Sequence, residues 1–250
     1  MTGVFDSGLG GLSAFLALSR ALPHTDLIYY ADTAHLPLGE KSKAEIRALV
    51  LRGVDFLARK GATRVFLACG TASSVALEKC KERFAFPVHG IVETGCKAAA
   101  RTSQTGRIAV IATPATIASH AYALGIRALR PDALITELAC PALVAAAEAC
   151  DPSAVRRALS PLSSSDADTL ILGCTHFPLL RNTIGELLPT MRLIDPAALT
   201  AEALVPLLEA EDLREEGARK LFTTGDPRLF ASRAEAALGC RLRVEGIMNL

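Results

Sequence analysis

Short apolar runs alternate with longer segments of helical pattern along almost the whole chain. Ten runs rich in β-branched and aromatic residues read GVFD, DLIYYAD, RVFLAC, VHGIV, RIAVIAT, ALITELAC, TLILGC, RLIDP, KLFTTG and LRVEG. Between most of them lie segments rich in Ala and Leu with helical spacing, as at residues 43–60 and 197–209. This alternation predicts an α/β fold with parallel sheets covered by helices. The continuous apolar strands predict sheets that are buried on both faces.

Polar and reactive residues fall where these predicted strands end. Ligands of parallel α/β folds bind at the carboxyl ends of the strands, so these positions are the first candidates for function. They are Asp6, Ser7, Asp32, Cys69, Thr113, Cys174 and Asp195. Asp195 has a plainer explanation, because the proline after it predicts the first turn of a helix that the aspartate caps.

Two of the strand ends resemble each other. The segment VFLACGTASS spans residues 65–74, and LILGCTHFPL spans residues 170–179. Each places a cysteine at the end of an apolar strand, ahead of small or polar residues. If two α/β units face each other, Cys69 and Cys174 lie on opposite walls of one cleft. The match is short, and most single cysteines are core residues. The small and polar residues that follow these two favour a function.

Two thiols across a cleft suit the inversion of a stereocentre. A thiolate is a base, and a helix N-terminus lowers the pKa of a thiol from its free value of about 8.5. One sulfur removes a proton from a carbon acid, and the other delivers a proton to the opposite face. Neither metal nor cofactor is required. Hydroxyl donors beside the thiols, on Thr71, Ser73 and Thr175, are suited to stabilise a substrate carboxylate.

Composition narrows the classes of protein further. The 250 residues suffice for one large domain or two small ones, and 27 basic against 26 acidic residues leave a net charge of +1. This balance gives no electrostatic reason to expect nucleic acid or an anionic membrane as partner. No apolar stretch approaches the roughly 20 residues of a membrane span, and the first residues lack a signal-peptide pattern, so we expect a cytoplasmic protein.

The cysteine and glycine patterns argue against three further classes of protein. The seven cysteines form no CxxC pair and no zinc-site spacing, which argues against a thiol–disulfide oxidoreductase and against a metal site. The loop GLGGLS at residues 8–13 has Ser13 where a dinucleotide-binding loop has its third glycine. We therefore expect no nucleotide. The glycines instead predict a tight turn that presents Asp6 and Ser7.

Six segments in order resemble the glutamate racemase family, within the wider aspartate/glutamate racemase superfamily. They are GVFDSGLGGLS at residues 3–13, YYADTAHLPLGEKS at 29–42, LACGTASS at 67–74, IAVIATPATIASHAY at 108–122, ACPALVAAAE at 139–148 and LILGCTHFPLL at 170–180. The resemblance covers nearly the whole chain. It implies two α/β domains with the active site between them, residues 1–92 plus 205–250 and residues 93–204. It also implies cofactor-independent racemisation of glutamate for peptidoglycan, and a homodimer.

The resemblance also implies roles for individual residues. The catalytic thiols and the acid or base residues that tune them match Cys69, Cys174, Asp6, His176 and Glu148. Residues implied to bind the substrate are Asp6, Ser7, Leu38, Gly39, Gly70, Thr71, Thr113, Thr116, Thr175 and His176.

The sequence departs from the family pattern in three places, two single residues and one short segment. Gly70 stands where the family usually has Asn, which removes a side-chain amide able to hydrogen-bond the substrate. Leu38 replaces a usual Tyr, and Glu93 and Thr94 lie in a segment that usually ends in Pro-Gly. Two alternatives therefore stay open. One is a racemase of the same superfamily for another substrate, such as aspartate or a hydantoin. The other is a catalytically impaired binding protein with the same fold.

Overall fold

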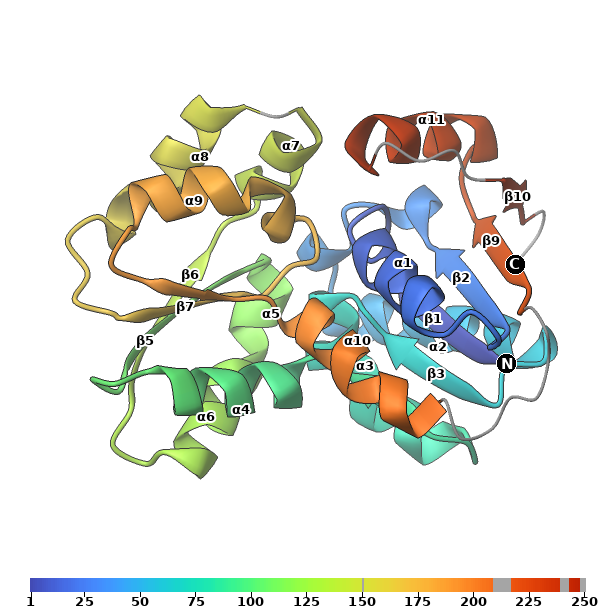
Figure 1. The fold of residues 1–250 in the computed structure, drawn as a ribbon, viewed down its shortest axis with the longest axis horizontal. Coiled ribbons are helices and arrows are strands. Elements are labelled where there is room, and N and C mark those ends of the chain that lie inside the picture. The colour runs from blue at the N-terminus through green and yellow to red at the C-terminus, as the bar shows by residue number, and fades with distance from the viewer. Residues whose placement is uncertain (150, 209–216, 239–242, 248–250) are drawn as a thin grey trace.

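The chain folds around two parallel β-sheets that lie side by side (Figure 1). The structure is a computed structural model, and it describes residues 1–149, 151–208, 217–238 and 243–247. The larger sheet has six strands in the order β10-β9-β2-β1-β3-β4, and the smaller has four in the order β6-β5-β7-β8. Every strand pair is parallel. The predicted α/β class with parallel sheets is confirmed.

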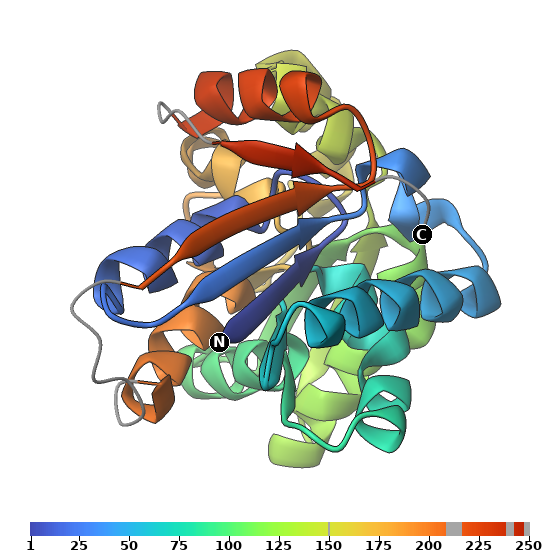
Figure 2. The ribbon, with the colours of Figure 1, turned by 90° about the vertical axis from the view of Figure 1, so that its right-hand side faces the viewer.

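The six-stranded unit combines the start of the chain with its C-terminal part. Its strands are β1 (Thr2–Asp6), β2 (Leu27–Ala31), β3 (Arg64–Leu67), β4 (Val88–Gly90), β9 (Arg219–Thr223) and β10 (Val244–Gly246). Its helices are α1 (Leu12–Ala21), α2 (Lys43–Arg59), α3 (Gly70–Arg83), α10 (Pro196–Leu208) and α11 (Pro227–Leu238), with the short 3₁₀ helices η1 (Thr33–His35) and η2 (Leu38–Glu40). Figure 2 shows its strands running in the same direction.

The four-stranded unit is formed by the middle of the chain. Its strands are β5 (Arg107–Ala112), β6 (Leu134–Ala139), β7 (Thr169–Leu172) and β8 (Arg192–Ile194). Its helices are α4 (Val92–Thr102), α5 (Pro114–Ser119), α6 (Ala121–Leu129), α7 (Ala142–Ala149), α8 (Pro152–Leu159) and α9 (Arg181–Leu187), with η3 (Ser160–Leu162) and η4 (Phe177–Leu180). The domain limits inferred from the resemblance stay a prediction.

Alternate residues of each central strand enter different cores, because successive side chains point to opposite faces. In β1, Val4 packs with α1, α10 and α11, whereas Phe5 packs with α2 and α3. In β7, Leu170 packs with α7, α8 and α9, and Ile171 packs with α4 and α6. Both sheets are thus covered on two faces, as their apolar sequences predict. The edge strands β4, β6, β8 and β10 are only partly buried, and in β6 none of the six residues is fully buried.

The helix predictions for residues 43–60 and 197–209 correspond to α2 and α10. Helix α2 begins with a capping box. The Ser42 hydroxyl accepts a hydrogen bond from the Glu45 amide at 3.3 Å, and the Glu45 carboxylate accepts one from the Ser42 amide at 3.0 Å. At α10, Asp195 accepts hydrogen bonds from the amides of Ala197 and Ala198 at 3.0 and 3.1 Å. The predicted capping role of Asp195 is confirmed.

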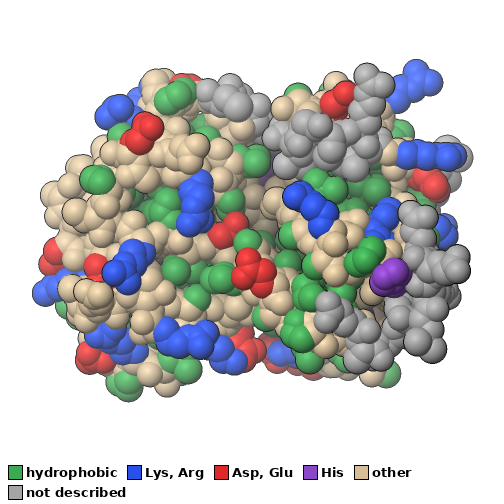
Figure 3. Space-filling model, viewed as in Figure 1, with side chains coloured by type: hydrophobic (Ala, Val, Ile, Leu, Met, Phe, Trp, Pro, Cys, Tyr) green, Lys and Arg blue, Asp and Glu red, His purple; other side chains and the backbone are tan. Residues whose placement is uncertain are grey.

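The exterior carries charges of both signs. On the face in Figure 3, basic and acidic side chains are interspersed and form no field of one sign. In the part of the chain that the structure describes, no helix has both the length and the apolar composition that crossing a bilayer requires.

Candidate active site

Cys69 lies two residues beyond the end of β3, at the position that begins helix α3. Its sulfur lies 3.6 Å from the hydroxyl oxygen of Ser7, which follows the neighbouring strand β1. Burial, together with the nearby Asp6 carboxylate, raises the pKa of the Cys69 thiol to about 12. The backbone amide of Ala72 and the Ser7 hydroxyl act in the opposite direction. The helix start alone predicts a lowered pKa, but burial outweighs it here.

Cys174 lies two residues beyond the end of β7, in the other unit. Its sulfur is 3.8 Å from Nδ1 of His176, which lies on the same strand-end turn before η4. An imidazole at this distance is placed to exchange a proton with the thiol as the side chains move. Cys69 and Cys174 therefore occupy corresponding positions in the two units.

Both thiols line one pocket between the two units. The side chains are largely buried, with 5% of Cys69 and 7% of Cys174 exposed, yet both reach the pocket surface. The pocket holds about 470 Å³ of space, part of it open to solvent. Its lining is Ser7, Leu36, Pro37, Leu38, Gly39, Glu40, Cys69, Gly70, Thr71, Thr113, Pro114, Pro141, Val144, Cys174 and His176. The structure thus brings together nine of the residues selected from the sequence.

Asp6 does not line the pocket but lies directly behind it. The side chain is fully buried, and Oδ1 accepts a hydrogen bond of 2.8 Å from the amide of Gly8. Oδ2 accepts one of 3.1 Å from the hydroxyl of Thr175, on the other unit. Burial raises the pKa of Asp6, against the opposing effects of His176 and of these hydrogen bonds. Asp6 therefore acts on the Cys69 thiol through space and links the two units.

Four hydroxyl groups form a chain along one side of the pocket. The oxygens of Thr71 and Thr113 are 2.8 Å apart, and those of Thr113 and Thr116 are 2.9 Å apart. Ser74 donates to the Thr116 oxygen at 3.4 Å. Thr71 and Thr113 lie on the pocket surface, whereas Thr116 lies behind them. The chain crosses from α3 to the start of α5 and joins the two units.

Thr116, Thr175 and Asp6 are the sequence-predicted site residues that lie behind the pocket surface. The remaining one, Glu148, has a side chain that lies outside the described part of the structure. Sequence reasoning missed Leu36, Pro37, Glu40, Pro114, Pro141 and Val144. All six fall inside family-like segments. Five of them have apolar side chains that do not indicate chemistry, and Glu40 is the one with an ionisable side chain.

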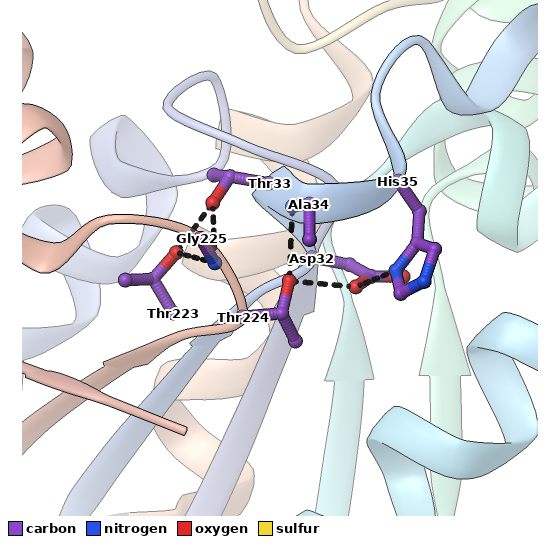
Figure 4. Close-up of polar contacts among 7 residues, drawn as sticks. All are labelled: Asp32, Thr33, Ala34, His35, Thr223, Thr224 and Gly225. Atoms are coloured by element: carbon purple, nitrogen blue, oxygen red, sulfur yellow. Dashed lines mark hydrogen bonds and ion pairs between the residues drawn. The ribbon is translucent and has the colours of Figure 1, made fainter. Parts of the chain in front are cut away.

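The segment of residues 32–40, which carries Leu38 and Gly39, is tied to the end of strand β9 (Figure 4). Asp32 is buried, and Oδ1 lies 2.7 Å from Nδ1 of His35. The Thr224 hydroxyl donates to the same oxygen at 2.9 Å and accepts from the amide of Ala34 at 3.0 Å.

A second pair of hydroxyls fixes the same segment. The Thr33 and Thr223 oxygens are 2.6 Å apart, and the Gly225 amide donates to Thr33 at 3.1 Å (Figure 4). The end of strand β9 therefore holds the segment that forms one wall of the pocket.

Among the described residues, no group of three or more His, Cys, Asp and Glu side chains has the arrangement of a metal site. In the described part of the chain, the chemistry available at the pocket comes from two thiols, one imidazole, the carboxyl groups of Glu40 in the lining and Asp6 behind it, and a set of hydroxyl and amide donors. These groups suit proton transfer to and from a small polar molecule.

Comparisons with known proteins agree with this arrangement. A family model described as Asp/Glu/Hydantoin racemase matches residues 13–204. A glutamate racemase of Gloeobacter violaceus is 42% identical over 240 residues, which cover 93% of this chain and 90% of that protein. The crystal structure of the glutamate racemase isoform RacE1 from Bacillus anthracis superposes with a TM-score of 0.93 at 33% identity, over 99% of this chain and 97% of that one.

A second solved structure, the glutamate racemase of Francisella tularensis in complex with D-glutamate, gives a TM-score of 0.91 at 31% identity. It covers 99% of this chain and 97% of the other. Fold, site and sequence together define a racemase fold with paired α/β units. The chain belongs to the Asp/Glu/hydantoin racemase family, and the relatives compared here are named as glutamate racemases.

Proposed function

We propose that this protein interconverts L- and D-glutamate by proton transfer between two thiols, without a cofactor. The observation that carries the proposal is that Cys69 and Cys174, from different units, line the same pocket. The substrate follows from the relatives, which are named for glutamate across nearly the full length of the chain.

Each turnover moves one proton on and one proton off the α-carbon. A thiolate on one side takes the α-proton and becomes a thiol, and the electron pair left on the carbon delocalises into the α-carboxylate. The thiol on the other side then gives its proton to the opposite face and becomes a thiolate. The two sulfurs have exchanged protonation states, so the enzyme is ready for the other enantiomer. Between turnovers, the protonation states of the two sulfurs return to their starting values through the neighbouring groups. These are Asp6 beside Cys69 and His176 beside Cys174.

The pocket supplies neutral donors for the substrate carboxylates. No Lys or Arg occurs among the described residues that line it. The hydroxyls of Ser7, Thr71 and Thr113 face it, and helix α3 begins at Gly70 with its first amides free of intrahelical partners. A helix N-terminus favours negative charge by its dipole. These donors support binding of an acidic amino acid, and they strengthen as charge builds up on the carboxylate.

The test is proton NMR of the purified protein with L-glutamate, and separately with D-glutamate, in deuterated water. We expect the α-proton signal to disappear as deuterium enters and the opposite enantiomer to accumulate. Cys69→Ser and Cys174→Ser should each abolish interconversion. Cys80→Ala is the matched control, since Cys80 is a buried thiol of the same unit as Cys69 that does not line the pocket. Normal turnover by both serine variants would refute the two-thiol mechanism.

The same assay with aspartate and with a hydantoin identifies which compound is the substrate. Exchange with one of these but not with glutamate would assign the chain to another branch of the family. Absence of exchange with all of them would identify a binding protein. We further infer a cytoplasmic homodimer that supplies D-glutamate for peptidoglycan, which light scattering and complementation of a D-glutamate auxotroph would test.

A further inference from the structure

Three glycines of the six-stranded unit are in direct contact with the four-stranded unit beside the pocket. Gly10 follows β1, Gly39 lies in η2, and Gly70 begins α3. We call them the interface glycines. Each faces a residue at a strand end of the other unit, and each approach is too close to admit a side chain.

Gly70 makes the closest of these approaches. A β-carbon at this position would overlap the carbonyl oxygen of Gly173 and lie 3.0 Å from its carbonyl carbon. It would also lie 3.7 Å from Cα of Cys174. The obstacle is backbone, so no rotation of a side chain relieves it. Gly70 directly follows one thiol and Gly173 directly precedes the other. The contact therefore joins the two catalytic turns themselves.

The other two interface glycines lie on either side of this contact. A β-carbon at Gly10 would overlap the Thr175 hydroxyl and lie 2.6 Å from the Thr175 carbonyl carbon. One at Gly39 would overlap Cβ of Thr113 and lie 2.7 Å from its other side-chain atoms. Real β-carbons essentially never come within 3.0 Å of such atoms. A side chain at any of the three positions would push the units apart.

Two hydrogen bonds hold the units together at the same points. Thr175, which covers Gly10, donates to Asp6 at 3.1 Å. Thr113, which covers Gly39, shares a hydrogen bond of 2.8 Å with Thr71. Both bonds are buried. The hydrogen bonds that hold the units together and the glycine contacts that limit how closely they approach therefore lie at the same places around the pocket.

We propose that the three interface glycines set the separation of Cys69 and Cys174, and so act as positioning residues for the reaction. Their function rests on the proposed two-thiol mechanism, because a substrate must touch both sulfurs at once. If so, the two units can approach this closely only because residue 70 is a glycine. The lack of an amide side chain at this position is then a consequence of the close approach. A shift of about 1 Å in the placement of reacting groups costs about 100-fold in rate.

The experiment compares crystal structures and steady-state kinetics of wild type, Gly70→Ala, Gly10→Ala and Gly39→Ala. We expect the distance between the two sulfurs to increase by about 1 Å in each variant, and kcat to fall about 100-fold with a smaller change in KM. Wild-type sulfur separation and wild-type kcat in all three variants would overturn the proposal. The structural comparison stands even if glutamate is not the substrate, so the two proposals fail separately.

Two glycines outside the interface provide controls. A β-carbon at Gly185 in α9 meets nothing nearer than 4.0 Å, so Gly185→Ala should leave both readouts unchanged. A β-carbon at Gly53 in α2 would collide with the rings of Phe5 and Tyr30 within one unit. Gly53→Ala should lower the melting temperature without changing the sulfur separation. It distinguishes a loss of stability from a loss of positioning.

Gly70→Asn distinguishes two explanations of this glycine. One is that it sets the spacing of the two units, and the other is that the site has simply lost an amide that binds the substrate. If spacing is what Gly70 provides, this variant behaves like Gly70→Ala or worse. If the amide is what the site lacks, Gly70→Asn raises kcat/KM above wild type at an unchanged sulfur separation, and the proposal is wrong at this position.

Discussion

The hydroxyl of Thr175 donates a hydrogen bond to the buried carboxylate of Asp6 across the boundary between the two units. Thr175 directly follows Cys174, and the Asp6 carboxylate raises the pKa of Cys69. One bond of 3.1 Å therefore connects the surroundings of both thiols. It makes the protonation of each side sensitive to how closely the units approach.

Replacing Thr175 by valine removes this bond at nearly constant volume. The pKa of Asp6 should rise further, because the hydrogen bond is one of the effects that lower it. A hydrogen bond to a charged group contributes about 1.5–3 kcal/mol, so the free energy of unfolding should fall by about that amount at neutral pH. Chemical denaturation and the pH profile of kcat/KM measure the two effects.

Thr169→Val is the matched control for this variant. Thr169 is fully buried in β7 and donates to the carboxylate of Asp168 at 2.9 Å, away from the pocket. The Thr169→Val variant should lower the free energy of unfolding and leave the pH profile of kcat/KM unchanged. If Thr175→Val also left that profile unchanged, the bond to Asp6 would be structural only.

The raised pKa of Cys69 predicts a loss of stability at high pH. The folded protein holds this proton up to about pH 12, whereas an unfolded chain releases it near its ordinary pKa of 9.0. Between these values the folded state binds more protons, so stability falls as pH rises. Cys69→Ser removes up to one proton from the difference between the folded and unfolded states. The free energy of unfolding should therefore fall less steeply with pH, by up to about 1.4 kcal/mol per pH unit.

The variant Cys80→Ala separates the effect of a buried thiol on stability from its effect on catalysis. Burial also raises its pKa to about 12, so Cys80→Ala should reduce the same slope. Only the Cys69 variant should lose interconversion of the enantiomers. Urea denaturation at several pH values from 9 to 11 gives the slopes. Identical slopes in wild type and Cys69→Ser would contradict the assigned direction of the pKa shift.

The contacts in Figure 4 predict that the end of strand β9 influences substrate binding. Thr224→Val removes one bond to Asp32 and one to the Ala34 amide, and so loosens the segment that carries Leu38 and Gly39. Because that segment lines the pocket, KM should rise several-fold, with a smaller effect on kcat. Steady-state kinetics measure both.

A control for this change is Thr63→Val. Thr63 is an exposed threonine of the same unit that donates only a long bond of 3.4 Å to the Met1 carbonyl, far from the pocket. Its KM should equal that of wild type. An unchanged KM in Thr224→Val as well would mean that the segment keeps its place without these two hydrogen bonds from the end of β9.

Much of this architecture follows from the sequence because parallel strands end at a common edge. The ten strands required only the apolar pattern, whereas the convergence of Cys69 and Cys174 also required the assumption that two α/β units face each other. The exposure of β6 could not be predicted, because a strand becomes an edge through the order of the whole sheet. The raised pKa of Cys69 was also hidden, since it results from burial and from the Asp6 carboxylate, which lies far away in the sequence.

Gly70 illustrates the same limit at a single residue. In the sequence it is a missing side chain, and its nearest neighbour belongs to a strand end far along the chain. Likewise, Pro141 and Val144 line the pocket because of the path of the chain into α7, which their residue types do not indicate. Contacts between distant segments decide these features, and apolar periodicity carries no information about them.

The proximity of His176 to Cys174 predicts a difference between the two enantiomers. Mirror-image substrates have equal free energies, so the equilibrium constant is one and kcat/KM must be the same in both directions for every variant. The individual proton transfers carry no such constraint. His176→Asn removes the imidazole 3.8 Å from the Cys174 sulfur and should slow the step in which that sulfur accepts the α-proton, by about 100-fold for lost acid–base assistance.

Substrate deuterated at the α-carbon reveals this asymmetry. In His176→Asn, the primary isotope effect should increase for the enantiomer whose proton Cys174 removes. It should decrease for the other enantiomer, because the slowed Cys174 step then follows the isotope-sensitive step. His89→Asn is the control, since His89 lies in β4 and does not line the pocket. Equal isotope effects for both enantiomers at wild-type turnover would exclude His176 from proton transfer. A selective increase would also assign Cys174 to one enantiomer and Cys69 to the other.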